Sequence, residues 1–273
     1  TSINFFQNGG HGQSSAIQLR GLPKRYSTVY IDGVKMSDPS SVSNDFDFNH
    51  ILTSQVSRVE ILKGNQSSVY GSGAIGGTIH ITTKKGKTGF NKDINYIVGS
   101  HDTHNLSASL SGGNDYSNYY VGLQRFQTDG ISQTTHNDED DRYRNNGLIA
   151  SYGYEFNDKF EFQSNARISE TYLQYDAICV SNLFGCSPDY DHAEETDAVE
   201  SSYNISLTYK PIEKLTNKFT VANTYIKRIY ASAPGSKNTV QDNYYGDRYA
   251  ILYKGNYNFN LDNSIVFGVE RED

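Results

Sequence analysis

The chain has 273 residues, of which 36% are hydrophobic, and it carries a formal net charge of −7. This acidic balance, with scattered lysines and arginines, argues against nucleic acid as a partner. No run of about 18 apolar residues occurs, so a transmembrane helix is excluded. Membrane-spanning strands stay open, because they need only about 9–11 residues with every second one apolar. The 22 tyrosines and 13 phenylalanines would suit the aromatic interfaces of such strands.

The N-terminal part predicts short strands joined by tight turns. Residues 16–21 alternate apolar and polar side chains and end in a glycine, which is typical of a short strand. Further on, the apolar segments 29–31 and 34–36 flank Asp32-Gly33, which is a strong hairpin signal.

The segment 56–83 is the most informative part of the chain. Its β-branched runs, 59–62 and 78–83, predict two strands with a short helical turn near Ser67–Tyr70 between them. The glycines in the turn that follows are Gly71, Gly73, Gly76 and Gly77, which supply positive φ and close backbone approach. Residues 71–76 match the Gly-x-Gly-x-x-Gly fingerprint, but that motif needs a helix after it and a β-branched run follows here. We therefore exclude a dinucleotide site, and a P-loop as well, since no Lys-Ser or Lys-Thr pair closes the loop.

Together these motifs resemble the plug domain of TonB-dependent outer-membrane receptors. The matching segments follow one another in the family's order and cover most of residues 16–84: Leu19-Arg20-Gly21, residues 30–34, residues 58–64 and residues 69–77. The family usually has Arg at position 63 and Pro at position 65, where this chain has Lys63 and Asn65. Lys63 keeps the charge and loses the bidentate fork of arginine. We expect residues 1–86 to be a plug domain that is truncated at its N-terminus.

The resemblance also gives a role to charges in the plug. Arg20 and Glu60 lie on predicted strands, where they would form a charge-assisted pair, and with Lys63 they would hold the plug against the barrel wall. The alternative is that they are solvated surface charges.

After residue 86 the pattern changes to segments with alternating polarity. Nine such strands are expected, one in each of the ranges 93–100, 104–112, 118–127, 147–156, 160–168, 202–210, 219–225, 249–259 and 265–269. Tight turns at 114–115, 157–158 and 261–263 alternate with long polar loops at 128–142, 174–197 and 230–244. Outer-membrane barrels have short turns on one side and long loops on the other.

We therefore predict a mainly β protein, in which an α+β plug domain precedes part of a large antiparallel transmembrane β-barrel. Receptors of this type close at about 22 strands, so residues 87–273 would be the N-terminal part of the wall, truncated at its C-terminus. A soluble β-sandwich binding module is the alternative of another class, in which the apolar faces would point into a core.

The long loops contain the remaining candidate site residues. Cys179 and Cys186 lie in one loop, where an oxidising cell-surface setting favours a disulfide. The acidic run 189–197 is either a solvated loop or part of a calcium site. By resemblance to cobalamin receptors, the calcium ligands would be Asp176, Asp189, Asp191 and Asp242.

The function implied by the resemblance is import of a scarce ligand across the bacterial outer membrane. Cobalamin is the first candidate, because Val98-Gly99-Ser100 and Tyr175-Asp176-Ala177 resemble cobalamin receptors, and a ferric siderophore is the runner-up. The implied partners are TonB with its inner-membrane energising complex, the ligand and outer-membrane lipid. No nucleophile with an activating base occurs, so an enzyme is not expected, and no prosthetic group is implied.

Overall fold

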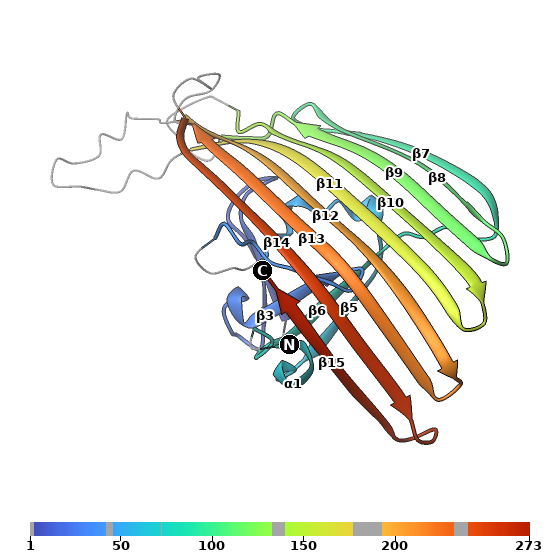
Figure 1. Ribbon diagram of the computed structural model, residues 1–273. Helices are drawn as coiled ribbons and strands as arrows, with labels where there is room; N and C mark the ends of the chain where they lie inside the picture. The colour runs from blue at the N-terminus through green and yellow to red at the C-terminus, as the bar shows by residue number, and fades with distance from the viewer. Residues whose placement is uncertain (1–2, 42–45, 72, 133–139, 177–192, 232–239) are drawn as a thin grey trace.

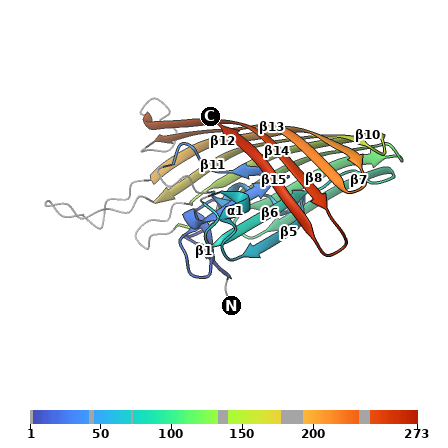
Figure 2. The same ribbon diagram turned by 60° about the horizontal axis from the view of Figure 1, so that its bottom comes forward.

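A computed structural model of the chain describes residues 3–41, 46–71, 73–132, 140–176, 193–231 and 240–273. A small α+β unit lies against one face of a large curved antiparallel sheet (Figure 1). The view turned by 60° shows α1 (Ser67–Tyr70), β5 (Val56–Lys63) and β6 (Gly77–Thr83) of the small unit below the strands of the large sheet (Figure 2). We call the small unit the plug and the large sheet the wall.

The plug consists of two small sheets with short helices between their strands. Its first sheet pairs β1 with β2, and its second has the strand order β4-β3-β6-β5, with β3 and β6 parallel. The element bounds are β1 Ile3–Gln7, β2 Ser15–Leu19, η1 Lys24–Tyr26, β3 Ser27–Ile31, β4 Val34–Met36, η2 Phe48–His50, η3 Thr53–Gln55, β5 Val56–Lys63, α1 Ser67–Tyr70 and β6 Gly77–Thr83. A buried apolar cluster holds the two sheets together, formed by Leu19, Val29, Ile31, Met36, Phe46, Ile79 and Ile81.

The predicted hairpin and glycine-rich turn are both present. Asp32 and Gly33 have φ values of 50° and 84°, as the turn between β3 and β4 requires. The Asp32 carboxylate also accepts hydrogen bonds from the backbone N–H (3.0 Å) and the hydroxyl (2.7 Å) of Thr83, which fixes the hairpin to the end of β6. The glycines are followed by strand β6 and not by the helix that a dinucleotide site would need, which agrees with the exclusion of such a site.

The wall contains nine antiparallel strands within the described residues, each paired with its neighbours in the chain. The strands are β7 Gly89–Gly99, β8 Thr103–Gly113, β9 Ser117–Thr128, β10 Tyr143–Asn157, β11 Phe160–Asp176, β12 Ala193–Ile212, β13 Leu215–Ala231, β14 Val240–Asn258 and β15 Ser264–Glu272. Tight turns join β8 to β9, β10 to β11, β12 to β13 and β14 to β15, and all of these lie at the end of the sheet shown at lower right in Figure 1. The boundary between the domains at residues 86 and 87 stays a prediction.

The wall is apolar on its outer face and polar on the face toward the plug. In β9, Leu123 is 57% exposed, whereas Gln124 beside it is 5% exposed. The same alternation brings Asn145, Asn165, Ser169, Asn204 and Asn223 of other strands into buried positions. A soluble sandwich would bury the apolar face instead, so this arrangement contradicts that alternative and is typical of a membrane barrel.

No helix in the described ranges is long and apolar enough to cross a membrane.

The prediction of loops at 128–142, 174–197 and 230–244 is wrong at their edges. Strand β11 continues to Asp176, β12 begins at Ala193, and β14 begins at Val240. Asp176 pairs with Ala193 across the ladder, and the Tyr175 hydroxyl donates to the Glu194 carboxylate at 2.8 Å. Polar side chains break the alternation in this region. The strands nevertheless extend past the apolar part of the outer face, because backbone hydrogen bonds and cross-strand side-chain pairs continue there.

Candidate functional site

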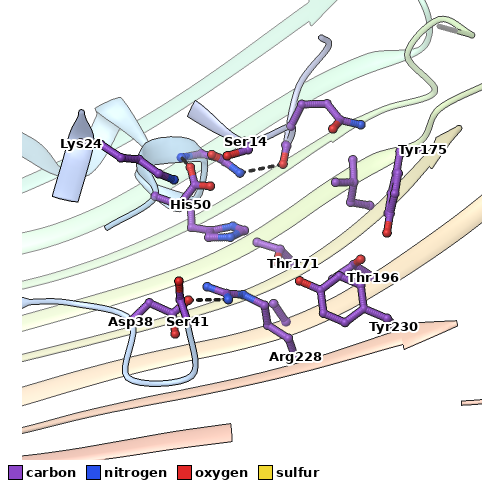
Figure 3. Close-up of a pocket in the computed structure, with 16 residues that line it drawn as sticks. Ser14, Lys24, Asp38, Ser41, His50, Thr171, Tyr175, Thr196, Arg228 and Tyr230 are labelled. Atoms are coloured by element: carbon purple, nitrogen blue, oxygen red, sulfur yellow. Dashed lines mark hydrogen bonds and ion pairs between the residues drawn. The ribbon is translucent and has the colours of Figure 1, made fainter. Parts of the chain in front are cut away.

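A cavity of about 310 Å³ lies between the plug and the wall, near the ends of β11 and β13 and the start of β12 (Figure 3). The plug lines it with Gly12, Gln13, Ser14, Lys24, Asp38, Ser41, Asp47, Asn49 and His50. The wall lines it with Thr171, Leu173, Tyr175, Thr196, Ala198, Arg228 and Tyr230. Hydroxyl, amide and charged groups predominate, so the cavity suits a ligand that forms hydrogen bonds.

On the plug side, Asp47 fixes two loops against each other. One of its carboxylate oxygens accepts from the backbone N–H of Ser15 at 3.1 Å and from the Ser15 hydroxyl at 3.0 Å. It also accepts from the backbone N–H of Asn49 at 3.3 Å, as the N-cap of helix η2. The Asn49 amide in turn donates to the Gly12 carbonyl at 2.8 Å. These bonds make the plug side of the cavity a preformed surface.

On the wall side, the charge of Arg228 is balanced by the plug. Its guanidinium pairs with the Asp38 carboxylate, and both side chains are largely buried. The other Asp38 oxygen accepts from the backbone N–H of Ser40 at 3.0 Å, which holds the carboxylate in place. Asp38 therefore neutralises Arg228 within the cavity and ties the plug to β13.

Two further arginines tie the wall to plug backbone. Arg167 of β11 donates to the His50 carbonyl at 2.9 Å, and Arg248 of β14 donates to the Lys35 carbonyl at 2.9 Å. With Arg228 they form a set that we call the wall arginines, and all three guanidiniums are held by plug oxygens.

Carboxylates of the wall complete these contacts. Glu200 lies 3.4 Å from Arg167 and 3.7 Å from the His50 imidazole. Glu272 accepts from Arg248 and lies 3.1 Å from the Lys35 ammonium. Each buried guanidinium thus has a carboxylate beside it, which offsets the cost of removing its charge from water.

The predicted plug charges lie elsewhere. Glu60 of β5 forms an ion pair with Arg58 at 3.1 Å, and both side chains are about half exposed. Arg20, at φ 57° after β2, has its guanidinium beside Gly64. Lys63 is exposed at the end of β5. The structure thus gives Glu60 a different cation from Arg20, and the role of these three residues in holding the plug stays a prediction.

The predicted glycines differ in what their positions demand. Gly77 has φ 144°, and a Cβ there would collide with the Leu62 carbonyl oxygen. Gly76 has no positive φ, but a Cβ would lie 3.1 Å from the Tyr26 carbonyl oxygen. Gly71 has φ 82° with open space around it, and a Cβ at Gly73 would lie 3.0 Å from the Thr28 hydroxyl.

The predicted calcium and disulfide residues lie only partly within the structure. Asp189, Asp191, Cys179 and Cys186 are outside the described residues. Asp176 is buried at the end of β11, and Asp242 is exposed in β14. Within the described ranges no group of three or more His, Cys, Asp or Glu side chains is placed to hold a metal ion. The calcium site and the disulfide stay predictions.

Sequence reasoning missed the wall arginines as a set. Arg167 was on the polar face of its predicted strand, but nothing in the sequence indicated a plug carbonyl as its partner. The available signal was a single arginine on an inward-facing row of asparagine, serine and threonine, where the charge would need a partner.

Comparison with known proteins agrees with this architecture. Residues 1–78 match the family described as TonB-dependent Receptor Plug Domain. The protein named vitamin B12 transporter BtuB of Vibrio cholerae is 29% identical over 215 residues, covering 77% of this chain and 33% of its own length. The protein of that name in Photobacterium profundum is 26% identical over 220 residues, covering 79% of this chain and 34% of its own. The chain thus spans about a third of the curated relatives it matches.

Solved structures show the same fold at lower sequence identity. The siderophore receptor PirA from Acinetobacter baumannii aligns with a TM-score of 0.72 and 16% identity, over 99% of this chain and 43% of its own. The FrpB iron transporter from Neisseria meningitidis aligns with a TM-score of 0.73 and 15% identity, over 99% of this chain and 44% of its own. Residues 1–78 thus match the plug domain of the TonB-dependent receptors, a family of outer-membrane transporters and not of enzymes, and the whole chain has the fold of such a plug followed by barrel strands.

Proposed function

We propose that the full-length protein imports a scarce ligand across the outer membrane and that the cavity between plug and wall is part of its binding site. The observation that carries the proposal is the cavity itself, because it is lined by plug loops on one side and by β11, β12 and β13 on the other. A ligand seated there would contact both parts and would be released when they move apart.

The plug and wall are suited to such a movement. Plug carbonyls and one plug carboxylate hold the wall arginines, and these bonds can be exchanged for bonds to water as the plug shifts. TonB, energised from the inner membrane, would supply the work by pulling a segment of the plug. The wall would stay in place, because its outer face is apolar and its strands are paired by continuous ladders.

Cobalamin is the ligand that we propose first. Among the described lining residues, the cations Lys24 and Arg228 are matched by the carboxylates Asp38 and Asp47, and Arg228 is already paired. A balanced lining rich in hydroxyls and amides favours a neutral ligand with many amide groups over a strongly anionic ferric siderophore, which would require surplus cations. The named vitamin B12 transporters support the same choice. A ferric siderophore is the second candidate, supported by the folds of PirA and FrpB.

The test is binding by the full-length protein, measured by calorimetry with cyanocobalamin and with ferric enterobactin. We expect Ala198→Phe, which fills the cavity from β12, to weaken binding of the true ligand by about tenfold or more. Val199→Phe is the matched control, because the next residue of the strand faces the other side of the sheet. If the two variants changed ligand binding equally, the cavity would not be part of the binding site.

Uptake by cells with and without TonB tests the transport step separately. Loss of TonB should abolish accumulation of the ligand while leaving binding to the cell surface intact. Accumulation that does not require TonB would contradict the proposed function.

We further propose that calcium orders the segments between β11 and β12 and between β13 and β14 through Asp176, Asp189, Asp191 and Asp242. Calcium takes six to eight oxygen ligands, and Asp176 and Asp242 are near the ends of β11 and β14 from which the loops extend. A disulfide between Cys179 and Cys186 would stiffen the same loop. Millimolar calcium should tighten ligand binding, and the double variant Asp189→Ala, Asp191→Ala should remove this effect. Calorimetry that detects no calcium binding to the wild-type protein would contradict the site.

A further inference from the structure

The outer face of the wall has two neighbouring hollows over β8–β11 that the proposed transport does not use. The larger hollow is apolar and has a volume of about 450 Å³. The smaller, of about 210 Å³, is lined by Arg125, Arg142 and Arg144 together with Tyr172. Arg125 lines both hollows. The two hollows therefore adjoin, one apolar and one basic, and we call the pair the outer groove.

The register of the strands explains this change of character. One row across the sheet, perpendicular to the strands, consists of Ala108, Leu123, Leu148 and Ile168. The next outward-facing row contains Arg125, Asn146 and Glu170, and the row after it contains Arg144 and Tyr172. Successive rows on one face are about 7 Å apart along the strands. The outer groove therefore crosses the edge of the apolar belt, where acyl chains give way to headgroups.

The guanidiniums of Arg125 and Arg144 place positive charge on the outer face of the wall. Arg125 donates to the Gln127 side-chain oxygen at 3.1 and 3.3 Å, and the Arg144 guanidinium lies 5.5 Å from the centre of the Tyr172 ring. In the described part of the chain, an amide and an aromatic ring orient these two cations without neutralising them. Arg142 is paired with Asp129 at 3.4 Å, so it is the weaker contributor.

A charge on the lipid-facing side of a barrel is disfavoured at mid-depth and tolerated near the interface, where it can reach a headgroup. Phosphate matches the planar fork of a guanidinium and forms strong charge-assisted hydrogen bonds with it. Three carboxylates also line the outer groove, Asp102 and Asp129 in its basic hollow and Glu170 in its apolar hollow. They would repel an anion from those sides, which leaves the surface of β9 and β10 around Arg125 and Arg144 as the place for it.

We propose that the outer groove binds a phosphorylated, acylated membrane lipid. The phosphate lies between Arg125 and Arg144, and one acyl chain lies in the apolar hollow. Ala108 helps to keep this hollow open, because its side chain is small in a row of leucine and isoleucine.

The experiment is native mass spectrometry of the full-length protein in a neutral detergent, titrated with diphosphorylated lipid A. Lipid A from which both phosphates have been removed is the comparison, because its acyl chains are the same. We expect the phosphorylated form to bind at least about tenfold more tightly, and the double variant Arg125→Gln, Arg144→Gln to lose this preference. Lys92→Gln is the matched control, since it removes an exposed cation of β7 whose ammonium lies over the Phe90 ring.

A second variant tests the apolar half independently. Ala108→Phe should fill the hollow and weaken binding of both forms of lipid A while keeping the preference for phosphate. The proposal is overturned if the two forms bind the wild-type protein equally, or if the arginine double variant binds as the wild type does. It is also overturned if the groove is covered by a second copy of the protein, which would appear as a dimer that the arginine variant dissociates.

Discussion

Gly77 shows how a single residue can constrain the plug. It begins β6 at φ 144°, and a side chain there would collide with the Leu62 carbonyl of the neighbouring strand. We expect Gly77→Val to destabilise the plug by about 1–3 kcal/mol through backbone strain and lost pairing. Ligand uptake should fall while the barrel still inserts into the membrane. Hydrogen exchange of the β5 and β6 amides in the full-length protein would measure the effect.

Gly10→Val is the control for this variant, because a Cβ at Gly10 meets nothing within 4 Å and its φ is not positive. Wild-type exchange rates and uptake in Gly77→Val would contradict the conformational requirement.

His80 makes the stability of the plug depend on pH. Its ring stacks on Tyr30 with the centroids 5.0 Å apart, and burial lowers the pKa of His80 below its ordinary value. The unfolded plug therefore binds more protons than the folded plug as the pH falls below about 6.5, and stability declines there. We expect β3 and β6 to exchange faster at pH 5.5 than at pH 7.5. In the His80→Gln variant the exchange rates at the two pH values should become similar. If they differ as in the wild type, another titratable group causes the pH dependence.

At the scale of the strands, alternation decides which face tolerates charge. Leu207 of β12 faces outward and Thr208 faces the plug side. Leu207→Arg should destabilise the full-length barrel by about 2–4 kcal/mol if it lies at mid-depth in the membrane, whereas Thr208→Arg should have little effect. Folding yields in lipid vesicles, measured by electrophoretic mobility without heating, compare the two variants. Equal yields would contradict the assignment of the faces.

Local signals in the sequence predicted local elements well. Asp32-Gly33 specifies its hairpin through positive φ, and period-2 alternation located all nine wall strands of the described chain. The end of β11 and the start of β12 were not predicted, because Tyr172 and Asp197 are polar partners across the ladder and break the apolar pattern. The cavity was not predictable either, since contacts such as that between Arg228 and Asp38 join residues far apart in the chain and depend on how the plug docks.

For the molecule as a whole, the contact between Arg228 and Asp38 links the wall to the plug. Arg228→Ala would leave a buried carboxylate without its cation, which costs about 3–5 kcal/mol in comparable sites. We expect residues 34–41 to become accessible to protease in the folded barrel. Arg58→Ala is the control, because its pair with Glu60 is exposed and worth at most about 1 kcal/mol.

Asp38→Asn in the Arg228→Ala background should restore part of the protection, since it removes the unpaired charge. Equal protease sensitivity of the Arg228→Ala and Arg58→Ala variants would show that the pair does not hold the plug.

The polar inner face of the wall has a thermodynamic consequence. Arginine and asparagine side chains of the wall form hydrogen bonds with plug backbone carbonyls, so undocking exposes polar groups together with apolar ones. Apolar exposure raises the heat capacity and polar exposure lowers it, so the heat-capacity change of undocking should be smaller than that of exposing apolar surface alone. A plot of the free energy of undocking against temperature should therefore be only weakly curved. Unfolding the plug's own apolar core would instead follow the steep curve of an ordinary globular domain.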